Sequence, residues 1–234
     1  MKRAVQGIML MLVGGAVVRL SISGSYTNYV KPGMRPFLTV AAALLVALGV
    51  YGLLRDELSR PPKSSAATAE RNDGHPAPRT AWLLLLPVLT IFLIAPPPLG
   101  AYAASHGTVS VPEPGAPLPA LHGDPADLDV TDFVVRAVWD DGKTLAGHRV
   151  RMTGFVTPGS GGAWYLTRIQ ISCCAADARP VKVAVLGAPA FAADTWVQVV
   201  GTWSPGGGTQ RADAIPLLRV QSVRTTVRPA NPYD

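Results

Sequence analysis

Residues 37–54 read Phe-Leu-Thr-Val-Ala-Ala-Ala-Leu-Leu-Val-Ala-Leu-Gly-Val-Tyr-Gly-Leu-Leu, with Pro36 before them and Arg55 after them. The stretch contains no charged residue and comes close to the roughly 20 apolar residues that a helix needs to cross a bilayer. It therefore predicts a membrane-spanning helix. The whole chain fits this class, because 48% of its 234 residues are hydrophobic and only 15% are charged.

Two further apolar segments lie on either side of this one. Residues 4–20 are interrupted only by Gln6 and by Arg19, whose long side chain can reach the headgroups from near the helix end. Residues 81–99 contain no charge at all, and Pro87 predicts a bend within them. We therefore expect about three transmembrane helices within residues 1–104.

The first apolar segment has an alternative interpretation as a cleaved signal peptide, because Lys2 and Arg3 precede it. Arg19 argues against cleavage, since it stands where a signal peptidase needs small neutral residues. A small-x-small pattern, Ala101-Tyr102-Ala103, follows the third segment and leaves cleavage there as another alternative.

Basic residues in the short loops predict the orientation of the three helices. The loops that the positive-inside rule would place in the cytoplasm carry seven Lys or Arg residues, and the opposite loop carries three. This bias predicts a cytoplasmic N-terminus, a cytoplasmic loop at 55–80 and an extracytoplasmic C-terminal domain. The seven are Lys2, Arg3, Arg55, Arg60, Lys63, Arg71 and Arg79, and the three are Arg19, Lys31 and Arg35.

Glycines in the first two segments predict a close approach of another helix, because a residue without a side chain leaves a smooth surface. They are Gly7, Gly14, Gly15, Gly49 and Gly52.

The region after the membrane segments divides into two parts. Residues 105–127 contain five prolines, which predict an extended stalk that separates the next domain from the bilayer. Residues 128–234 alternate apolar and polar side chains, which is typical of half-buried strands.

A small barrel is the predicted fold of residues 128–234. Asp129 or Thr131 can cap a short helix that ends near Trp139, and five strands with turn residues between them follow. Five short strands suit a Greek-key barrel of OB type. The predicted strands are 149–157, 164–171, 181–186, 195–203 and 217–227.

The two cysteines of the chain, Cys173 and Cys174, are adjacent and follow the second predicted strand. Three interpretations stay open: one thiol is buried in the barrel as a small apolar side chain while the other is partly exposed, both thiols bind a transition-metal ion together with Asp177, or they form a redox pair. His122 or His148 would add a nitrogen ligand to the metal site.

The sequence contains no motif of a known catalytic site, so we predict no enzyme and no cofactor other than a transition-metal ion. The net charge of +6 is placed mainly around the apolar segments, which favours a role in membrane orientation. Nucleic-acid binding by aromatic stacking on Trp164, Tyr165, Trp196 and Trp203 is an alternative that we do not expect of an extracytoplasmic domain.

The chain resembles the YcgQ-like family of bacterial permease subunits over nearly its whole length. The most specific mark of this resemblance is Cys173-Cys174-Ala175-Ala176-Asp177-Ala178. Further marks are Gly154-Phe155-Val156, Thr167-Arg168, Trp196-Val197 and Asn231-Pro232-Tyr233. The resemblance implies a two-component complex with a larger polytopic permease, and it raises metal-related transport.

The leading hypothesis from the sequence is therefore an accessory subunit of a membrane permease. Its helices would contact the lipid bilayer and the permease, while the outer barrel contacts the cargo or gates access to it. The alternative is a membrane-anchored binding or thiol-sensing protein that acts without a transporter.

Overall fold

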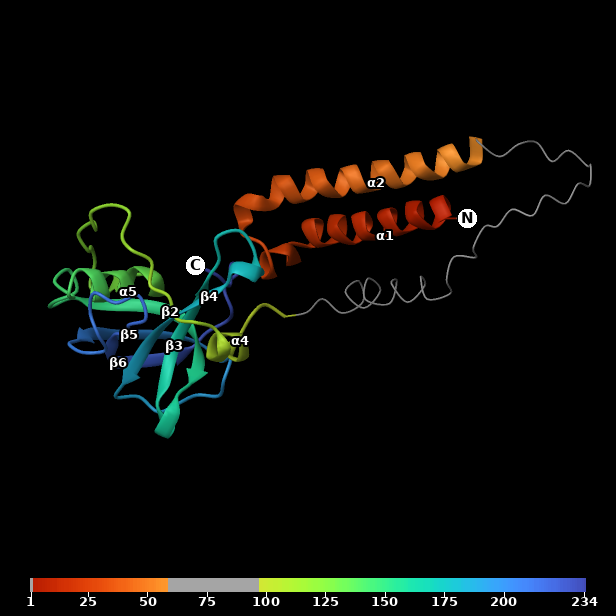
Figure 1. Cartoon of the computed structure of the whole chain (residues 1–234). Helices are drawn as coiled ribbons and strands as arrows, with labels where there is room; N and C mark the ends of the chain where they lie inside the picture. The colour runs from red at the N-terminus through yellow and green to blue at the C-terminus, as the bar shows by residue number, and fades with distance from the viewer. Residues whose placement is uncertain (1, 59–96) are drawn as a thin grey trace, which may run out of the picture. The chain divides into compact units, whose positions relative to one another are not determined.

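The computed structural model describes residues 2–58 and 97–234, and it divides the chain into two compact units (Figure 1). The segment Thr27–Lys31 groups with Pro98–Asp234 in the second unit, although it lies between the two N-terminal helices in the sequence.

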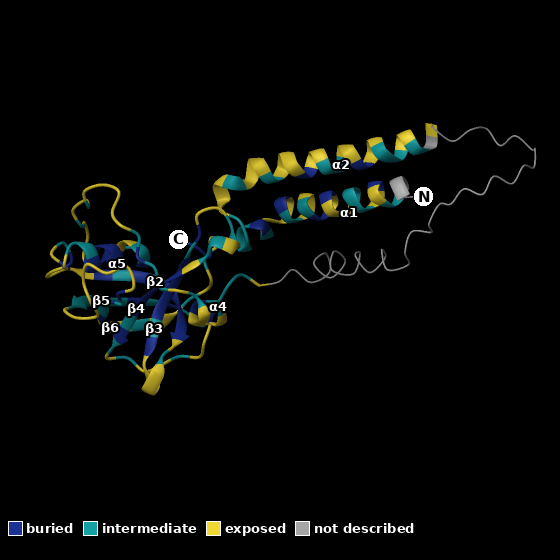
Figure 2. Ribbon diagram, viewed as in Figure 1, coloured by how far each residue is buried: buried dark blue, intermediate teal, exposed yellow. Residues whose placement is uncertain are grey.

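The first unit contains the helices α1 (Lys2–Ser23) and α2 (Arg35–Leu58), separated in the sequence by the 3-10 turns η1 (Ser25–Asn28) and η2 (Pro32–Met34). Within the described residues, Val5–Ser23 and Pro32–Asp56 are long and apolar enough to cross a membrane, with mean hydropathies of 1.8 and 2.4. Figure 2 shows that much of the surface of α2 is exposed, which is unlike a core helix of a soluble protein.

The second candidate span contains the predicted segment 37–54, and the first covers the predicted segment 4–20 from residue 5 onward. The structure thus describes two candidate spans where the sequence predicts about three. The predicted third span, 81–99, lies outside the described residues except for its last three positions.

Glycines bring α1 and α2 into close contact. A side-chain carbon added at Gly7 would lie 2.9 Å from the Gly49 carbonyl oxygen, and one at Gly14 would lie 2.7 Å from Val46. The smooth faces predicted from these glycines are therefore used between the two helices of the same chain. Gly15 and Gly52 have no neighbour within 4 Å of such a carbon in the described structure.

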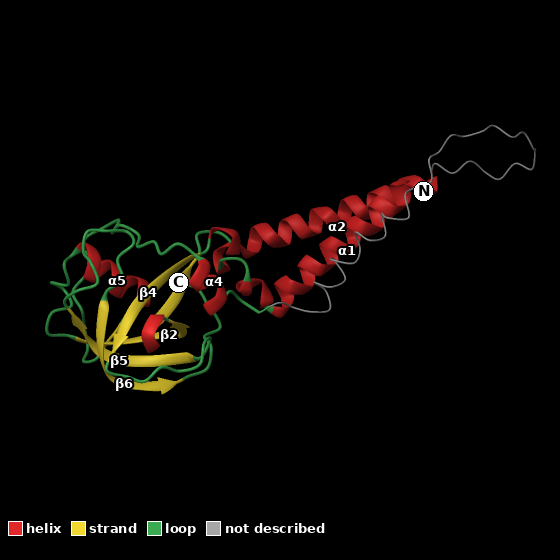
Figure 3. Cartoon of the chain, turned by 60° about the horizontal axis from the view of Figure 1, so that its bottom comes forward, coloured by secondary structure: helices red, strands yellow, loops and turns green. Residues whose placement is uncertain are grey.

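The second unit is a closed barrel of five strands, shown in Figure 3. The strands follow the order β2-β3-β4-β6-β5, and β5 pairs back onto β2 to close the barrel. The alternation of apolar and polar residues placed all five strands correctly to within about two residues at each end. The strands are β2 (Arg149–Pro158), β3 (Trp164–Gln170), β4 (Arg179–Leu186), β5 (Trp196–Ser204) and β6 (Leu217–Thr225), with a short parallel strand β1 (Ala126–Asp127) beside β2.

The pairing of β5 with β6 contains a bulge, and a glycine permits the close approach of the two strands there. The register between β5 and β6 shifts between Val200 and Gly201, which marks a bulge. A side-chain carbon at Gly201 would collide with the carbonyl oxygen of Arg219. Only glycine therefore fits where the two strands approach at this bulge.

The helix α5 (Val130–Trp139) packs its apolar residues against the inward-facing residues of the barrel. Phe133, Val134 and Val138 are completely buried with Leu166 and Val183 from the strands. Asp129 occupies the N-cap position as predicted, although its side chain makes no capping hydrogen bond.

A second, smaller apolar cluster lies apart from the main core. The short helix α4 (Ala101–His106), which the sequence did not predict, buries Ala101 and Ala104 against Phe155, Ile169 and Ile171. Tyr233 completes the cluster and is only 2% exposed. The small-x-small pattern at 101–103 is thus helical, with its first residue buried.

The prediction of a free stalk at 105–127 was wrong. Val111 is 3% exposed within the main core, and its N–H donates to the Ala212 carbonyl oxygen at 2.8 Å. The indole N–H of Trp139 donates to the Pro112 carbonyl oxygen at 2.9 Å, and Leu118 and Leu121 pack against the core. Prolines favour an extended backbone here, but the apolar residues between them bind that backbone to the barrel.

Candidate metal site

The candidate site lies on the connection between β3 and β4, residues 171–178, which we call the cysteine turn. One carboxylate fixes its shape, because Asp177 accepts hydrogen bonds from the N–H groups of Ser172 and Cys173, each at 2.8 Å. Ile171 anchors the start of the turn in the second apolar cluster and is 1% exposed. The turn therefore has a defined conformation at the surface of the barrel.

The turn brings both thiols and the carboxylate together, as predicted for Cys173, Cys174 and Asp177. The Cys173 thiol lies 3.6 Å from the Cys174 sulfur, and one ligand atom from each of the three residues lies within 4.8 Å of the others. In a regular strand, neighbouring side chains would point to opposite faces. The reversal of the chain before η5 (Ala175–Asp177) removes this obstacle.

The charges of the site favour a protonated thiol and an ionised carboxylate. The hydrogen bond from the Cys173 thiol, followed by those from backbone N–H groups, lowers the pKa of Asp177 to about 2. The same hydrogen bond to Asp177, together with the neighbouring Cys174, raises the pKa of Cys173 to about 11. A metal ion that binds here at neutral pH must therefore displace a proton from Cys173.

Both cysteines are free thiols in the structure, with Cys173 exposed and Cys174 half-buried. Neither thiol is fully buried, whereas the packing interpretation places one of them inside the barrel as a small apolar side chain. Of the three interpretations from the sequence, packing alone is therefore the least consistent with the geometry.

The predicted histidine ligands do not join this group in the described part of the chain. His148 lies instead near Asp124, whose pKa is lowered first by a hydrogen bond from Arg149 and to a smaller extent by the nearby His148. His122 belongs to the segment that packs along the barrel before β1.

One segment distant in sequence pairs with the cysteine turn, and the sequence alone did not identify it as part of the site. Val30 forms an antiparallel bridge with Cys174, in which Lys31 N–H donates to the Cys173 carbonyl oxygen at 3.1 Å. The N–H of Ala175 donates to the Tyr29 carbonyl oxygen at 2.7 Å. These contacts use backbone atoms, so no side-chain pattern could have revealed them.

The C-terminus in turn contacts the segment 27–31. The Tyr233 hydroxyl donates to the Asn28 carbonyl oxygen at 2.6 Å and accepts from the Leu99 N–H at 3.0 Å. Burial raises the pKa of Tyr233, so the hydroxyl keeps its proton and remains a donor. Asp234 pairs with Arg168 at 2.6 Å, and both side chains are less than a tenth exposed.

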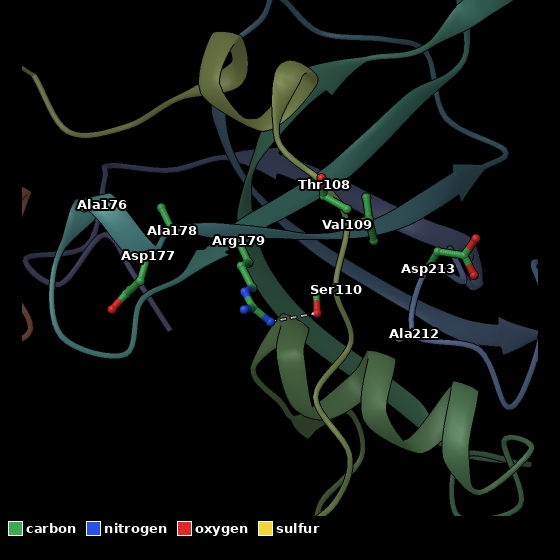
Figure 4. Close-up of a pocket in the computed structure, with 9 residues that line it drawn as sticks. All are labelled: Thr108, Val109, Ser110, Ala176, Asp177, Ala178, Arg179, Ala212 and Asp213. Carbon is green, nitrogen blue, oxygen red and sulfur yellow. Dashed lines mark hydrogen bonds between the residues drawn. The ribbon is translucent and has the colours of Figure 1, made fainter.

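A surface hollow of about 660 Å³ adjoins the cysteine turn, and Figure 4 shows the residues around it. Asp177, Arg179 and Asp213 supply its charged groups, and Arg179 donates to the Ser110 hydroxyl at 3.4 Å. The hollow leaves space beside the cysteine turn for a group larger than a single ion.

Two of the four aromatic residues considered for base stacking, Trp164 and Trp196, pack within the barrel. Trp164 is 2% exposed, and its indole N–H donates to the Ala188 carbonyl oxygen at 3.2 Å. Trp196 packs against Phe155 and below the Arg168 guanidinium. Trp164 and Trp196 thus stabilise the barrel, while the Tyr165 ring lies beside the ammonium group of the buried Lys182.

The fold and the site together define a class: a small five-stranded barrel joined to two apolar helices, with a dithiol and carboxylate group on one barrel turn. The N-terminal domain of the DUF1980 family matches residues 5–109, and the C-terminal domain of the same family matches residues 133–233. The chain therefore belongs to the DUF1980 family.

Other comparisons add little to this assignment. No curated protein sequence matches the chain. A chain of the Stn1-Ten1 complex of S. pombe is similar at 17% identity over 47% of this chain and 83% of that chain, with a TM-score of 0.26. At that TM-score the similarity carries no argument about fold or function.

Proposed function

We propose that this protein is the accessory subunit of a two-component membrane permease and that its barrel presents a transition-metal ion at the outer membrane surface. The observation that carries the proposal is the convergence of two thiols and one carboxylate, all within 4.8 Å, on an accessible turn. The YcgQ-like resemblance supplies the expectation of a permease partner.

The donor set supports a soft or borderline ion such as Zn²⁺ or Cu⁺, because thiolates select such ions over Mg²⁺ or Ca²⁺. Structural zinc sites are usually closed by four protein ligands, whereas open sites keep a position for an exchangeable group. Three ligands on an exposed turn fit transient binding and transfer better than permanent storage. The half-buried Asp177 contributes charge as well as an oxygen ligand.

The segment between the two helices supports a barrel on the side opposite to the N-terminus, which is the outer side if the N-terminus is cytoplasmic as the basic residues predict. Thr27–Lys31 belongs to the same compact unit as the barrel, and it follows α1 and precedes α2 in the chain. If both helices cross a membrane, this segment and the barrel lie on the same side, opposite to Leu58 at the end of α2. Residues 81–96 lie outside the described part of the chain. A third crossing at 81–99 would return the chain from the side of Leu58 to the side of the segment 27–31.

A metal titration of the full-length protein in detergent micelles tests the ion site. We use Cd²⁺ as the probe, because its thiolate bonds absorb in the ultraviolet and report the number of thiolate ligands, and Zn²⁺ as the competitor. Cys173→Ser and Cys174→Ser should each weaken Cd²⁺ binding by at least about tenfold, since each removes one of only three ligands.

His122→Ala with His148→Ala is the matched control, because these histidines are absent from the group and their loss should leave Cd²⁺ binding unchanged. Equal affinities of the wild type and both serine variants would eliminate the ion site. Affinity purification from cells that express both components at native levels tests the permease partner. If no polytopic protein co-purifies in mild detergent, the stand-alone binding protein replaces the permease subunit.

A further inference from the structure

The segment Thr27–Lys31, which we call the docking loop, extends the cysteine turn by one antiparallel pairing. The bridge between Val30 and Cys174 places one hydrogen bond on each side, from Lys31 N–H to the Cys173 oxygen and from Ala175 N–H to the Tyr29 oxygen. The backbone on both sides of the second thiol is therefore held by the docking loop.

The other end of the docking loop is held by the C-terminal tail. The buried Tyr233 hydroxyl donates to the Asn28 oxygen, and Tyr233 itself bridges to Ile169 near the end of β3. The N–H of Asp234 donates to the Ile169 carbonyl oxygen at 3.0 Å. The docking loop is thus fixed at two points on the same end of β3, from which the cysteine turn begins.

Such an arrangement affects ion binding through preorganisation. A turn that is already held in one conformation loses less conformational freedom when an ion binds, and its affinity is correspondingly higher. The two thiols here lie 3.6 Å apart while the docking loop is paired with the turn. Release of the docking loop would free the backbone at residues 173–175 and separate the sulfur atoms for part of the time.

We propose that the docking loop positions Cys173 and Cys174 for the ion and that ion occupancy in turn strengthens the docking of this loop. The inference rests on the proposed ion site. Because coupling between two binding events is reciprocal, any gain in ion affinity from docking implies an equal gain in docking from the ion. The docking loop lies in the sequence between α1 and α2, so occupancy at the barrel is transmitted to the segment that joins the two helices.

The critical variant is Lys31→Pro, compared with Lys31→Ala. Both substitutions remove the exposed ammonium group, but only proline removes the N–H that donates to the Cys173 oxygen. Proline at 31 also favours an extended Val30, so it leaves the conformation of the bridge residue in place. The comparison therefore isolates one backbone hydrogen bond.

In full-length protein in micelles, Lys31→Pro should bind Cd²⁺ about tenfold more weakly than Lys31→Ala, as expected from the loss of one hydrogen bond that orders the turn. Hydrogen exchange of the Ala175 amide provides a readout that does not depend on transport. Cd²⁺ should slow this exchange about tenfold in Lys31→Ala, which matches the expected difference in Cd²⁺ affinity. It should slow the exchange much less in Lys31→Pro.

Tyr233→Phe provides a second variant that keeps the buried ring and removes only the hydroxyl that holds Asn28. Like Lys31→Pro, it should weaken Cd²⁺ binding and speed the hydrogen exchange of the Ala175 amide. Equal Cd²⁺ affinities of Lys31→Pro and Lys31→Ala, with the wild type binding normally, would overturn the role of the docking loop alone. Failure of the wild type itself to bind Cd²⁺ would overturn the ion site and this inference with it.

Discussion

The buried ion pair between Arg168 and Asp234 offers a quantitative test of how the C-terminus stabilises the barrel. The Arg168 Nε donates to Asp234 Oδ1 at 2.6 Å, and the two side chains are 9% and 7% exposed. Asp234→Asn removes the negative charge while it keeps an oxygen that can accept from Arg168. The variant therefore removes the ionised partner that the guanidinium contacts directly, and leaves only the more distant Asp129 carboxylate.

The expected cost follows from this burial. Breaking a buried pair by removal of one partner costs about 3–5 kcal/mol. Arg168 retains its hydrogen bond to the Tyr233 carbonyl oxygen at 3.0 Å and its contact with the Trp196 ring at 5.3 Å, so we place the loss at about 3 kcal/mol. That is a large share of the roughly 5–15 kcal/mol that stabilises an ordinary domain.

Asp124→Asn is the matched control, because Asp124 also pairs with an arginine at 2.7 Å, but the two side chains are 45% and 67% exposed. An exposed pair contributes less than about 1 kcal/mol. Hydrogen exchange at the buried amides of Leu166 and Val183, in full-length protein in micelles, reports the free energy of opening of the barrel. Asp234→Asn should accelerate this exchange by about 150-fold and Asp124→Asn by less than about fivefold. Similar acceleration of exchange in both variants would refute the reasoning that burial determines how much an ion pair contributes to the free energy of unfolding.

Two further predictions concern the thiols. Asp177→Asn should speed the alkylation of Cys173 by iodoacetamide at pH 8 by about tenfold, because the thiolate is the nucleophile and Asp177 holds the Cys173 pKa at about 11. In the wild type the rate of Cys173 alkylation, followed by mass spectrometry, should keep rising with pH until the Cys173 pKa of about 11 is reached. A plateau near pH 9 would contradict this prediction. A membrane-impermeant maleimide should label Cys173 in intact cells, since the proposed topology places the barrel outside; labelling only after lysis would reverse that topology. Cys173→Ser with Cys174→Ser is the blank for both measurements, because the chain contains no other cysteine.

Much of the fold could be predicted because the relevant signals are local. The five strands were located from alternating side chains, and the helix α5 from an apolar stripe that ends at Trp139. The two described candidate spans follow from hydropathy alone. The spacing of Cys173, Cys174 and Asp177 likewise suggested a site, because residues within one turn are close wherever that turn is placed.

Other features could not be predicted because they depend on distant partners. The prolines at 112–125 indicate an extended backbone, but they do not indicate that Val111 enters the core or that Trp139 bonds to Pro112. The glycines of α1 and α2 indicated close helix packing without identifying the partner, which in this chain is the other helix. His148 resembled a ligand in sequence and lies beside Asp124 instead.

The sequence by itself determined the two apolar helices, the five strands and the grouping of two thiols with a carboxylate, since each depends on residues close together in the chain. Only the tertiary structure determined that Thr27–Lys31 pairs with the cysteine turn and that Tyr233 holds Asn28. The physical reason is that each of these contacts has a backbone N–H or carbonyl group as a partner, and nearly every residue carries such groups. No choice of side chains marks such groups as partners until the fold brings them together.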